Sequence, residues 1–388
     1  MTRSTCGEDG SWDVVVVGAG PAGCAAAAAV RDARPQARVL VVDRAEFPRD
    51  KVCGDGIAAE VGDVLTELGF DVDAIFAGAH AVQQLTLQSP GGVRASRVLP
   101  RSVHVIPRTR FDAALVRDIT RRGIEIRRHT VRSITTDPHG VVLDGVLRAR
   151  IVVGADGAES VVRRMLHRRP QPPHQVALAI RGYAPALEGQ GNDQVIVMTR
   201  QHWPAYAWSF PIGNGQANVG YGQLLSTDPE SMTRKQMLLR LGQLLAAVPN
   251  RLEHVRAHKL PLSTGRPRIP DGRVLLAGDA QSLINPFTGE GIYYAVRSGA
   301  LAGRAAASSL ERHGGDAGST YRGLLRAGLG RHLRHTSALA RLGGRPGIID
   351  AGLRAGAADQ RSFDDLVRLG LADGLITARL VRRLRFTG

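Results

Sequence analysis

The apolar residues of this chain fall into short runs that are separated by glycine and by charged residues. Residues 14–17 and 39–42 are wholly apolar and mostly β-branched, which is the pattern of a strand buried on both faces. Further strands of this kind are predicted at 148–153 and 273–277, and an alanine run at 25–29 predicts a helix after the first strand. This order of strands and helices is typical of an α/β protein.

A second kind of segment alternates between apolar and polar positions. Within residues 171–268, such strands are predicted at 175–182, 194–199, 206–211 and 217–224, with one helix at 232–248. Residues 82–99 alternate in the same way around a Pro-Gly-Gly turn. Because alternation indicates a sheet with one face in the core, this region predicts an antiparallel sheet that faces a substrate.

Helical spacing of apolar residues fills most of the remaining chain. It predicts helices at 57–68, 113–122 and 292–310, and a helical region with glycine breaks from residue 321 to the end. In that last region His332 and His335 stand three residues apart without an acidic partner, so we expect them on a solvated helix face.

Three glycines follow the first predicted strand with the spacing G-x-G-x-x-G. Gly18 makes the tight turn, Gly20 lets the backbone approach a pyrophosphate, and Gly23 lets helix and strand pack closely. The helix that follows directs unpaired N–H groups and a partial positive charge at the phosphates. Asp43, at the end of the second strand, is placed to hydrogen-bond a ribose hydroxyl. The stretch therefore predicts a dinucleotide site.

Two later strands also end in glycine and an acid, as Asp156-Gly157 and as Gly278-Asp279. Three such units in this order resemble the FAD-binding proteins of the glutathione-reductase superfamily, which include aromatic hydroxylases, flavin-dependent halogenases and geranylgeranyl reductases. The resemblance covers residues 13 to about 310. It implies a third motif whose aspartate bonds the ribityl chain, followed by a helix whose first N–H groups face the flavin N1–C2=O edge.

Further stretches resemble the geranylgeranyl reductase family in particular. Pro48-Arg-Asp-Lys51-Val-Cys53-Gly54 is similar to its P-x-x-K-x-C-G loop, and Tyr206-Ala-Trp208-Ser-Phe210-Pro211, followed by Gly220, is similar to its Y-x-W-x-F-P…G motif. The run at 285–294 resembles its third motif, and the Cys-Gly-Asp-Gly form around Asp55 resembles the bacterial menaquinone-reducing branch.

The resemblance implies a fold class and a division into domains. The class is α/β, with a Rossmann-like FAD-binding domain, a second antiparallel β-sheet substrate domain and a helical C-terminal region. Residues 11–165 and 270–320 would form the discontinuous FAD-binding domain, residues 171–268 with part of 80–105 the substrate-binding sheet, and residues 321–388 the helical region.

The resemblance also implies the residues that contact FAD. Position by position they are Gly18, Gly20, Ala22, Gly23, Asp43, Cys53, Gly54, Gly56, Arg108, Val131, Asp279, Gly291 and Ile292. Val131 would contribute through its backbone at the adenine end.

Several side chains of these motifs allow two interpretations each. Cys53 is either a contact or proton donor near the flavin or a small buried packing residue. Asp55 either changes the local potential or caps the helix expected at 57, and Lys51 either steers a phosphate or is solvated. Trp208 and Phe210 either line an apolar substrate cleft or belong to an ordinary core. Tyr206 is a further candidate proton donor, so the candidate catalytic residues are Cys53, Asp55 and Tyr206.

The implied activity is that of an FAD-dependent oxidoreductase which reduces carbon–carbon double bonds of an isoprenoid, a prenyl quinone or another apolar unsaturated substrate. The alternative is an FAD-dependent monooxygenase of secondary metabolism, a hydroxylase or epoxidase, because this scaffold hosts several chemistries. A non-catalytic flavoprotein is a third possibility. Because no second complete G-x-G-x-x-G unit is present, the reductant is NAD(P)H bound transiently, or a redox partner such as a ferredoxin or free reduced flavin.

Composition adds limits on partners and location. The net charge of +16 favours anionic partners, but aromatic residues make up only 4% and no nucleic-acid motif is present, so no nucleic-acid partner is expected. The three cysteines, Cys6, Cys24 and Cys53, suit neither a disulfide framework nor a metal site, so no metal is expected. Residues 1–11 lack a signal peptide's apolar core, and no run is long enough to span a membrane. We therefore expect a cytoplasmic protein with possible peripheral contact to an anionic membrane through the arginine-rich C-terminal helices.

Overall fold

A computed structural model describes residues 11–167, 171–225, 232–245, 252–311 and 316–386. Cys6 and most of the N-terminal segment considered above lie outside the described residues, as do the last residues of the helix expected at 232–248.

The first sheet holds the glycine-rich turn. Within the described residues it has seven strands in the order β6-β2-β1-β9-β8-β7, with β15 paired to β9. Strands β1, β2, β6, β9 and β15 pair in parallel, whereas β7, β8 and β9 pair antiparallel. Their bounds are β1 Trp12–Val17, β2 Val39–Asp43, β6 Glu125–Arg128, β7 Ile134–Asp137, β8 Gly140–Leu143, β9 Leu147–Gly154 and β15 Val274–Leu276. The carboxyl ends of β1, β9 and β15 therefore meet at one edge, where the three glycine–acid units follow.

The second sheet contains the aromatic motif. Its eight strands, counted over the described residues, run in the order β14-β10-β13-β12-β11-β4-β5-β3. Their bounds are β3 Gly56–Ile57, β4 His80–Gln88, β5 Arg94–Val105, β10 Val176–Pro185, β11 Asp193–Thr199, β12 Ala205–Gly213, β13 Gln216–Leu224 and β14 Glu253–Pro261. All neighbours pair antiparallel except β4 and β11, which are parallel.

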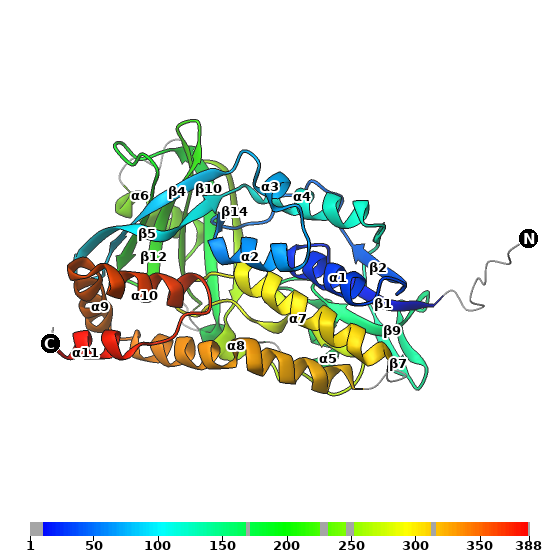
Figure 1. The fold of residues 1–388 in the computed structure, drawn as a ribbon. Coiled ribbons are helices and arrows are strands. Elements are labelled where there is room, and N and C mark those ends of the chain that lie inside the picture. The colour runs from blue at the N-terminus through cyan, green and yellow to red at the C-terminus, as the bar shows by residue number, and fades with distance from the viewer. Residues whose placement is uncertain (1–10, 168–170, 226–231, 246–251, 312–315, 387–388) are drawn as a thin grey trace, which may run out of the picture.

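Helices α1 and α7 lie together along one face of the first sheet, and α9 and α10 pack against the second sheet (Figure 1). Helix α8 runs along the base of the molecule, and α9, α10 and α11 gather at the end opposite β1 (Figure 1). The bounds are α1 Pro21–Ala33, α2 Ala59–Glu67, α3 Val72–Phe76, α4 Arg108–Arg121, α5 Val161–His167, α6 Arg234–Leu244, α7 Ile292–Glu311, α8 Ala317–Leu342, α9 Pro346–Ala358, α10 Gln360–Leu371 and α11 Ala378–Phe386. Among these helices, none has both the length and the hydropathy needed to cross a bilayer.

Helices α1 and α7 pack against each other at very short range because small residues face each other. A Cβ added to Gly299 would lie 2.1 Å from the carbonyl oxygen of Ala22, and one added to Gly303 would lie 2.3 Å from that of Ala26. The alanine run of α1 is buried throughout. This contact fixes the N-terminal ends of the two helices relative to each other.

The α/β class with two sheets and C-terminal helices is confirmed. The residue limits of the three domains stay a prediction. Two helix boundaries were wrong: the helix expected from residue 57 begins at Ala59, because Ile57 belongs to β3, and the helix expected from 113 begins at Arg108. The second sheet is not wholly antiparallel, since β4 pairs in parallel with β11.

Two further features differ from expectation. Strand β14 was missed because it is an edge strand rich in charged residues and lacks apolar alternation. His332 is not on a solvated face: its exposed fraction is 2%, and its ring nitrogens lie 2.7 Å from the Tyr294 hydroxyl and 2.7 Å from the Gly374 carbonyl oxygen. His335 accepts from the Ile376 N–H at 2.9 Å. Both histidines therefore connect α8 to neighbouring segments through hydrogen bonds.

The α1–α7 contact gives a test of this fold. Replacing Gly299 by Ala places a methyl group in steric conflict with the Ala22 carbonyl oxygen. We expect this substitution to lower the free energy of unfolding by about 1–3 kcal/mol. Gly323→Ala is the control, because Gly323 is exposed on α8 with nothing within 4 Å of its Cβ position, and there alanine should stabilise the helix by up to about 1 kcal/mol. Denaturant unfolding measures both; equal stability of the two variants would contradict the close helix packing.

Candidate functional site

A cavity of about 300 Å³ lies between the second sheet, the starts of α1 and α7, and the C-terminal helices. Of the thirteen residues expected to contact FAD, seven line it: Cys53, Gly54, Gly56, Arg108, Asp279, Gly291 and Ile292. These residues come from four separate parts of the chain, so folding brings them together at one place. The other six lie outside the lining of this cavity.

The remaining six belong to the end of the site at the first sheet. Gly18 has φ +103°, and a Cβ there would lie 2.4 Å from the Ala155 carbonyl oxygen, so only glycine fits this turn. Gly20 caps α1 without a side-chain hydrogen bond, and the first turn of α1 holds no acidic residue. Asp43 accepts from the Ala19 N–H at 2.8 Å and so fixes the turn. Val131 is buried in the core beside the sheet.

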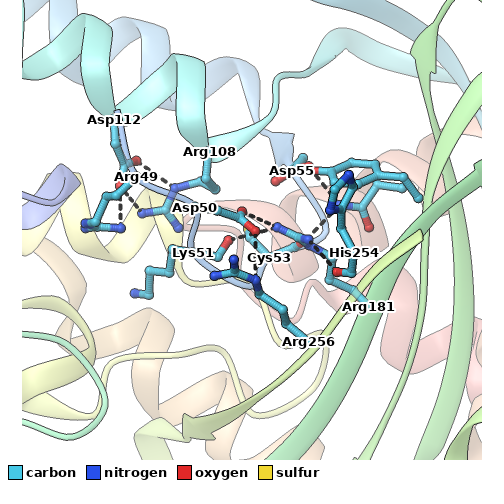
Figure 2. A network of polar contacts seen from close by, with 12 residues as sticks. Arg49, Asp50, Lys51, Cys53, Asp55, Arg108, Asp112, Arg181, His254 and Arg256 are labelled. Carbon is cyan, nitrogen blue, oxygen red and sulfur yellow. Dashed lines mark hydrogen bonds and ion pairs between the residues drawn. The ribbon is translucent and has the colours of Figure 1, made fainter. Parts of the chain in front are cut away.

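The loop between β2 and β3 reaches from this turn to the cavity, and two of its cations, Arg49 and Lys51, are paired with buried acids. Arg49 approaches the Gly20 Cβ position to 3.3 Å and lies 3.2 Å from the Asp112 carboxylate. Arg108 donates two hydrogen bonds to the same carboxylate, at 2.6 and 2.8 Å (Figure 2). Burial disfavours the Arg108 charge, but Asp112 outweighs it and holds the pKa of Arg108 above its usual value.

Lys51 and Asp279 form the second pair. The Lys51 Nζ lies 2.8 Å from the Asp279 Oδ2, and both residues line the cavity. Burial would raise the pKa of Asp279, but the Lys51 cation outweighs this and lowers it, so the carboxyl is ionised. Of the two interpretations of Lys51, a freely solvated side chain does not agree with this ion pair, and a role toward a phosphate stays a prediction.

Cys53 faces the cavity with its thiol beside Arg108 and the Asp55 N–H. Burial raises the pKa of this thiol; the Asp55 charge raises it further, while Arg108 acts in the opposite direction. The group is therefore a protonated thiol at neutral pH.

Asp55 does not line the cavity but lies behind its wall. The residue is fully buried, and its Oδ2 accepts from the Tyr183 hydroxyl at 2.7 Å and from the Asn218 Nδ2 at 2.8 Å. Its Oδ1 has no partner among the described residues. Burial raises the pKa of Asp55 to about 6 against these two hydrogen bonds. Asp55 does not cap α2, which begins after Ala58 without a side-chain cap, so that interpretation was wrong.

A chain of polar contacts connects Asp55 with the edge of the second sheet (Figure 2). The Arg181 guanidinium is buried and lies 4.7 Å from the Tyr183 ring centroid. Arg181 donates to Asp50, whose other carboxylate oxygen lies 3.4 Å from Nε of the exposed Arg256. Asn218 also donates to the Cys53 carbonyl oxygen at 2.8 Å, so this network fixes the loop against the sheet.

One face of the second sheet changes from apolar to basic across its strands. Directly paired residues share a face of a sheet, and one such row runs Ile196, Trp208, Gly220, Arg181 and Arg256. The cavity covers the apolar half of this face, and the β2–β3 loop covers the basic half.

The aromatic motif forms the apolar wall of the cavity. Trp208 and Phe210 both line it, and Trp208 also donates from Nε1 to Asn218 at 2.9 Å. The Trp208 ring stands over Gly220, where an added Cβ would lie 2.2 Å from it. Tyr206 lines the cavity too, but its hydroxyl donates to the Thr288 carbonyl, and burial raises the pKa of its phenol. The cleft interpretation of Trp208 and Phe210 agrees with these positions.

Sequence reasoning missed two titratable residues of this cavity. Glu290 lies between the two glycines that precede α7, and this placement in a glycine-rich turn was the available signal. His258 lies on β14, the missed strand; its Nε2 has no partner among the described residues, and burial lowers the pKa of His258 to about 4.

The residues present fit an FAD molecule that extends from α1 to α7. The uncapped first turn of α1 offers N–H groups and no competing acid to a pyrophosphate. The cavity beside α7 is lined by the expected flavin-contacting residues and continues along an apolar wall. A planar ring with a long polar tail suits this combination of donors and surface.

Comparison with known proteins agrees with this assignment. Residues 11–322 match the family described as FAD binding domain. The menaquinone reductase of Mycolicibacterium smegmatis is 32% identical, with 75% of each chain covered. The digeranylgeranylglycerophospholipid reductase 1 of Methanopyrus kandleri is 32% identical, with 77% of this chain and 81% of that protein covered.

Solved structures show the same fold. A geranylgeranyl bacteriochlorophyll reductase-like protein from Thermoplasma acidophilum superposes with a TM-score of 0.81 at 19% identity, covering 96% of each chain. A flavin-dependent brominase superposes with a TM-score of 0.72 at 18% identity, covering 97% of this chain and 98% of that one.

The burial of Asp55 predicts a pH-dependent stability. Its pKa is about 6 in the folded protein against an ordinary value of 3.8, so the folded state binds a proton between these values that the unfolded state does not. The stabilisation from this proton is fully present below pH 3.8 and is lost as the pH rises through about 6. The shift corresponds to about 3 kcal/mol.

Asp55→Asn keeps an acceptor for Tyr183 and Asn218 and removes the titration. We expect this variant to be more stable than the wild type at about pH 7, and the difference to shrink as the pH falls to about 4. Urea unfolding across this range measures it, with exposed Asp32→Asn as the control. A stability difference that does not change with pH would contradict the buried, titrating carboxyl.

The contact between Trp208 and Gly220 gives a second test on the cavity wall. Gly220→Ala forces the indole ring aside, so we expect a loss of about 1–3 kcal/mol and a changed tryptophan fluorescence spectrum. Gly222→Ala is the matched control on the same strand and face, since its added Cβ meets nothing closer than 3.7 Å. Identical spectra and stabilities for the two variants would show that the ring does not stand over Gly220.

Proposed function

This chain belongs to the geranylgeranyl reductase family of FAD-binding oxidoreductases, and from that premise we propose that it reduces carbon–carbon double bonds of an apolar isoprenoid or prenyl-quinone substrate. The observation that carries the proposal is the single cavity in which the expected flavin contacts and an apolar wall meet. The names of the relatives, reductases of menaquinone and of digeranylgeranylglycerophospholipid, support this substrate class.

In this proposal the thirteen FAD contacts divide along the molecule. The turn at Gly18, Gly20 and Gly23, with Ala22, binds the pyrophosphate, while Asp43 binds the ribose and Val131 the adenine end. The remaining residues hold the ribityl chain and the flavin ring: Cys53, Gly54, Gly56, Arg108, Asp279, Gly291 and Ile292. Because Asp279 is ionised and paired with Lys51, it is ready to accept from ribityl hydroxyls.

Bound FAD, once reduced, supplies a hydride for one carbon of the double bond. The chain excludes water and provides the proton for the other carbon. The Cys53 thiol faces the cavity, but burial and the Asp55 charge from behind the wall raise its pKa, which makes it a weak acid at neutral pH. Tyr206 is a weaker candidate for donation, because its hydroxyl proton is used in the bond to the Thr288 carbonyl.

The apolar lining of the cavity supports a substrate with a long apolar chain. Besides Trp208 and Phe210, side chains of the C-terminal helices complete its lining, among them Leu353, Leu366 and Val367. An apolar chain buried there gains roughly 0.8 kcal/mol for each methylene removed from water. We therefore propose that the isoprenoid lies between the sheet and α9–α10, with its double bond at the Cys53 end.

The far end of the cavity supports peripheral contact with an anionic membrane. Ala340 and Gly343, near the α8–α9 turn, line the cavity, and the neighbouring Leu342 is 55% exposed between exposed arginines at 341 and 345. An apolar tip flanked by cations is suited to the interface of anionic lipid. In this arrangement a lipid substrate enters near the surface on which the protein lies.

The source of electrons is a separate proposal. The basic half of the second sheet, with Arg256 at its exposed edge, suits the phosphates of NAD(P)H or the acidic surface of a redox partner. Either donor would approach from the side opposite the apolar wall.

Anaerobic turnover tests the proposed reaction. The FAD-loaded protein, reduced with dithionite and incubated with prenyl quinones and geranylgeranyl lipids without O₂, should yield products heavier by two hydrogen atoms per reduced bond. Mass spectrometry of the extracted lipid measures this, with oxidised protein as the control. Products that require O₂ and gain an oxygen atom would instead identify the monooxygenase and overturn the reductase.

A further inference from the structure

Glu290 occupies the corner where the expected flavin position meets the substrate cavity. It lies between Gly289 and Gly291, two residues before α7 begins, and it lines the cavity together with Cys53 and Tyr206. The chain is fixed on both sides of it: the Asn285 N–H donates to the Glu290 carbonyl oxygen at 2.8 Å, and the Glu290 N–H donates to the Thr288 Oγ1 at 3.3 Å. Its carboxyl is therefore held at a defined place in the wall.

The partners of the carboxyl are backbone amides rather than cations. The Tyr293 N–H donates to Oε1 at 2.9 Å, and the Ile292 N–H also bonds the side chain. Among the described residues, no lysine or arginine forms an ion pair with Glu290. The amides at the start of α7 are also the groups expected to face the flavin N1–C2=O edge.

This environment gives the carboxyl an unusual proton affinity. Burial raises the pKa of Glu290 to about 7, and the charge of Asp279 acts in the same direction. The hydrogen bonds from the two amides and the charge of Arg108 lower it but do not outweigh burial. A general acid acts best when its pKa lies near the working pH. The titratable groups that face Glu290 come from α4, the turn after β15, the β2–β3 loop, β12 and α7 itself. In that order they are Arg108, Asp279, Cys53, Tyr206 and Tyr294.

We propose that Glu290 is the proton donor of the reduction and that it takes up this proton as FAD binds. The inference rests on the proposed function, because it assigns a role in that reaction. The π bond of the substrate breaks, one carbon receives the hydride from reduced FAD, and the other receives the proton from the Glu290 carboxyl. FAD is left oxidised, Glu290 is left as a carboxylate, and the product has gained two hydrogens.

The Glu290 carboxylate and the flavin carbonyl compete for the same amides at the start of α7. This competition couples protonation of Glu290 to the binding of FAD. A flavin carbonyl that accepts from the Ile292 and Tyr293 N–H groups removes the hydrogen bonds that favour the Glu290 carboxylate. The ring also displaces water from the cavity, which disfavours the charge further. Both effects favour the protonated acid, so binding of FAD prepares the donor.

Calorimetry of FAD binding tests this coupling without any turnover. Titrations of the FAD-free protein at about pH 7 in buffers of different ionisation enthalpy report the protons taken up. The wild type should take up roughly half a proton per FAD, since a group is half protonated at its pKa, and Glu290→Gln should take up none. Glu311→Gln, an exposed acid at the other end of α7, is the control with the same charge change and should behave as the wild type.

Single-turnover reduction of a prenyl quinone by the dithionite-reduced holoenzyme tests the catalytic role. The wild-type rate should fall with rising pH through the Glu290 pKa of the holoenzyme, which lies above the value of about 7 in the FAD-free protein. Glu290→Gln should lose roughly 10²–10⁴-fold in rate and show no such break. Glu290→Asp keeps a titratable carboxyl and should retain part of the rate together with a pH break.

The possible results separate the two proposals. If the wild type reduces the alkene and Glu290→Gln does so at the same rate and with the same pH profile, the role of Glu290 is overturned and the reductase stands. Proton uptake that is equal in the wild type and Glu290→Gln also overturns it. If the wild type binds FAD and reduces no alkene, the proposed function fails. Loss of FAD binding in both Glu290→Gln and Glu290→Asp would show a structural residue and would overturn the donor.

Discussion

The structure depends on the anchoring of one loop, between β2 and β3, by buried charges. Arg49 is paired with Asp112, Lys51 with Asp279, and Asp50 with Arg181. These partners lie on α4, on the turn that follows β15 and on the second sheet. Each pair joins a buried side chain to one that is partly exposed, so breaking it costs less than the roughly 3–5 kcal/mol of a fully buried pair. The three pairs therefore determine how the glycine turn, the start of α7 and the sheet lie relative to each other.

This anchoring explains why one cavity can serve two purposes. The loop carries Cys53 and its flanking glycine to the boundary between the phosphate-binding end and the apolar face of the second sheet. The same sheet face changes from apolar to basic at Gly220, directly beneath the loop. A hydride carrier and an apolar acceptor can then meet at one wall, while the Asp50, Arg181 and Arg256 side chains interact on the other side of the loop.

Much of the phosphate end was predictable, because its chemistry is local in sequence. The turn at Gly18, its helix and Asp43 follow within one strand–helix–strand unit, where spacing fixes geometry. The polar half of the site was not predictable in this way. Asp55 and Tyr183 meet only after the loop packs on the sheet, and strand β14 with His258 has no apolar alternation to reveal it. Glu290 stood within a recognised motif, but its proton affinity comes from burial, which the sequence does not display.

The central claim is that an FAD molecule lies between the start of α1 and the start of α7. The visible absorption spectrum of the purified, folded protein tests it most directly, before and after incubation with FAD and removal of the excess. We expect the bands of a bound flavin at one FAD per chain. A folded protein that remains colourless after incubation would contradict it.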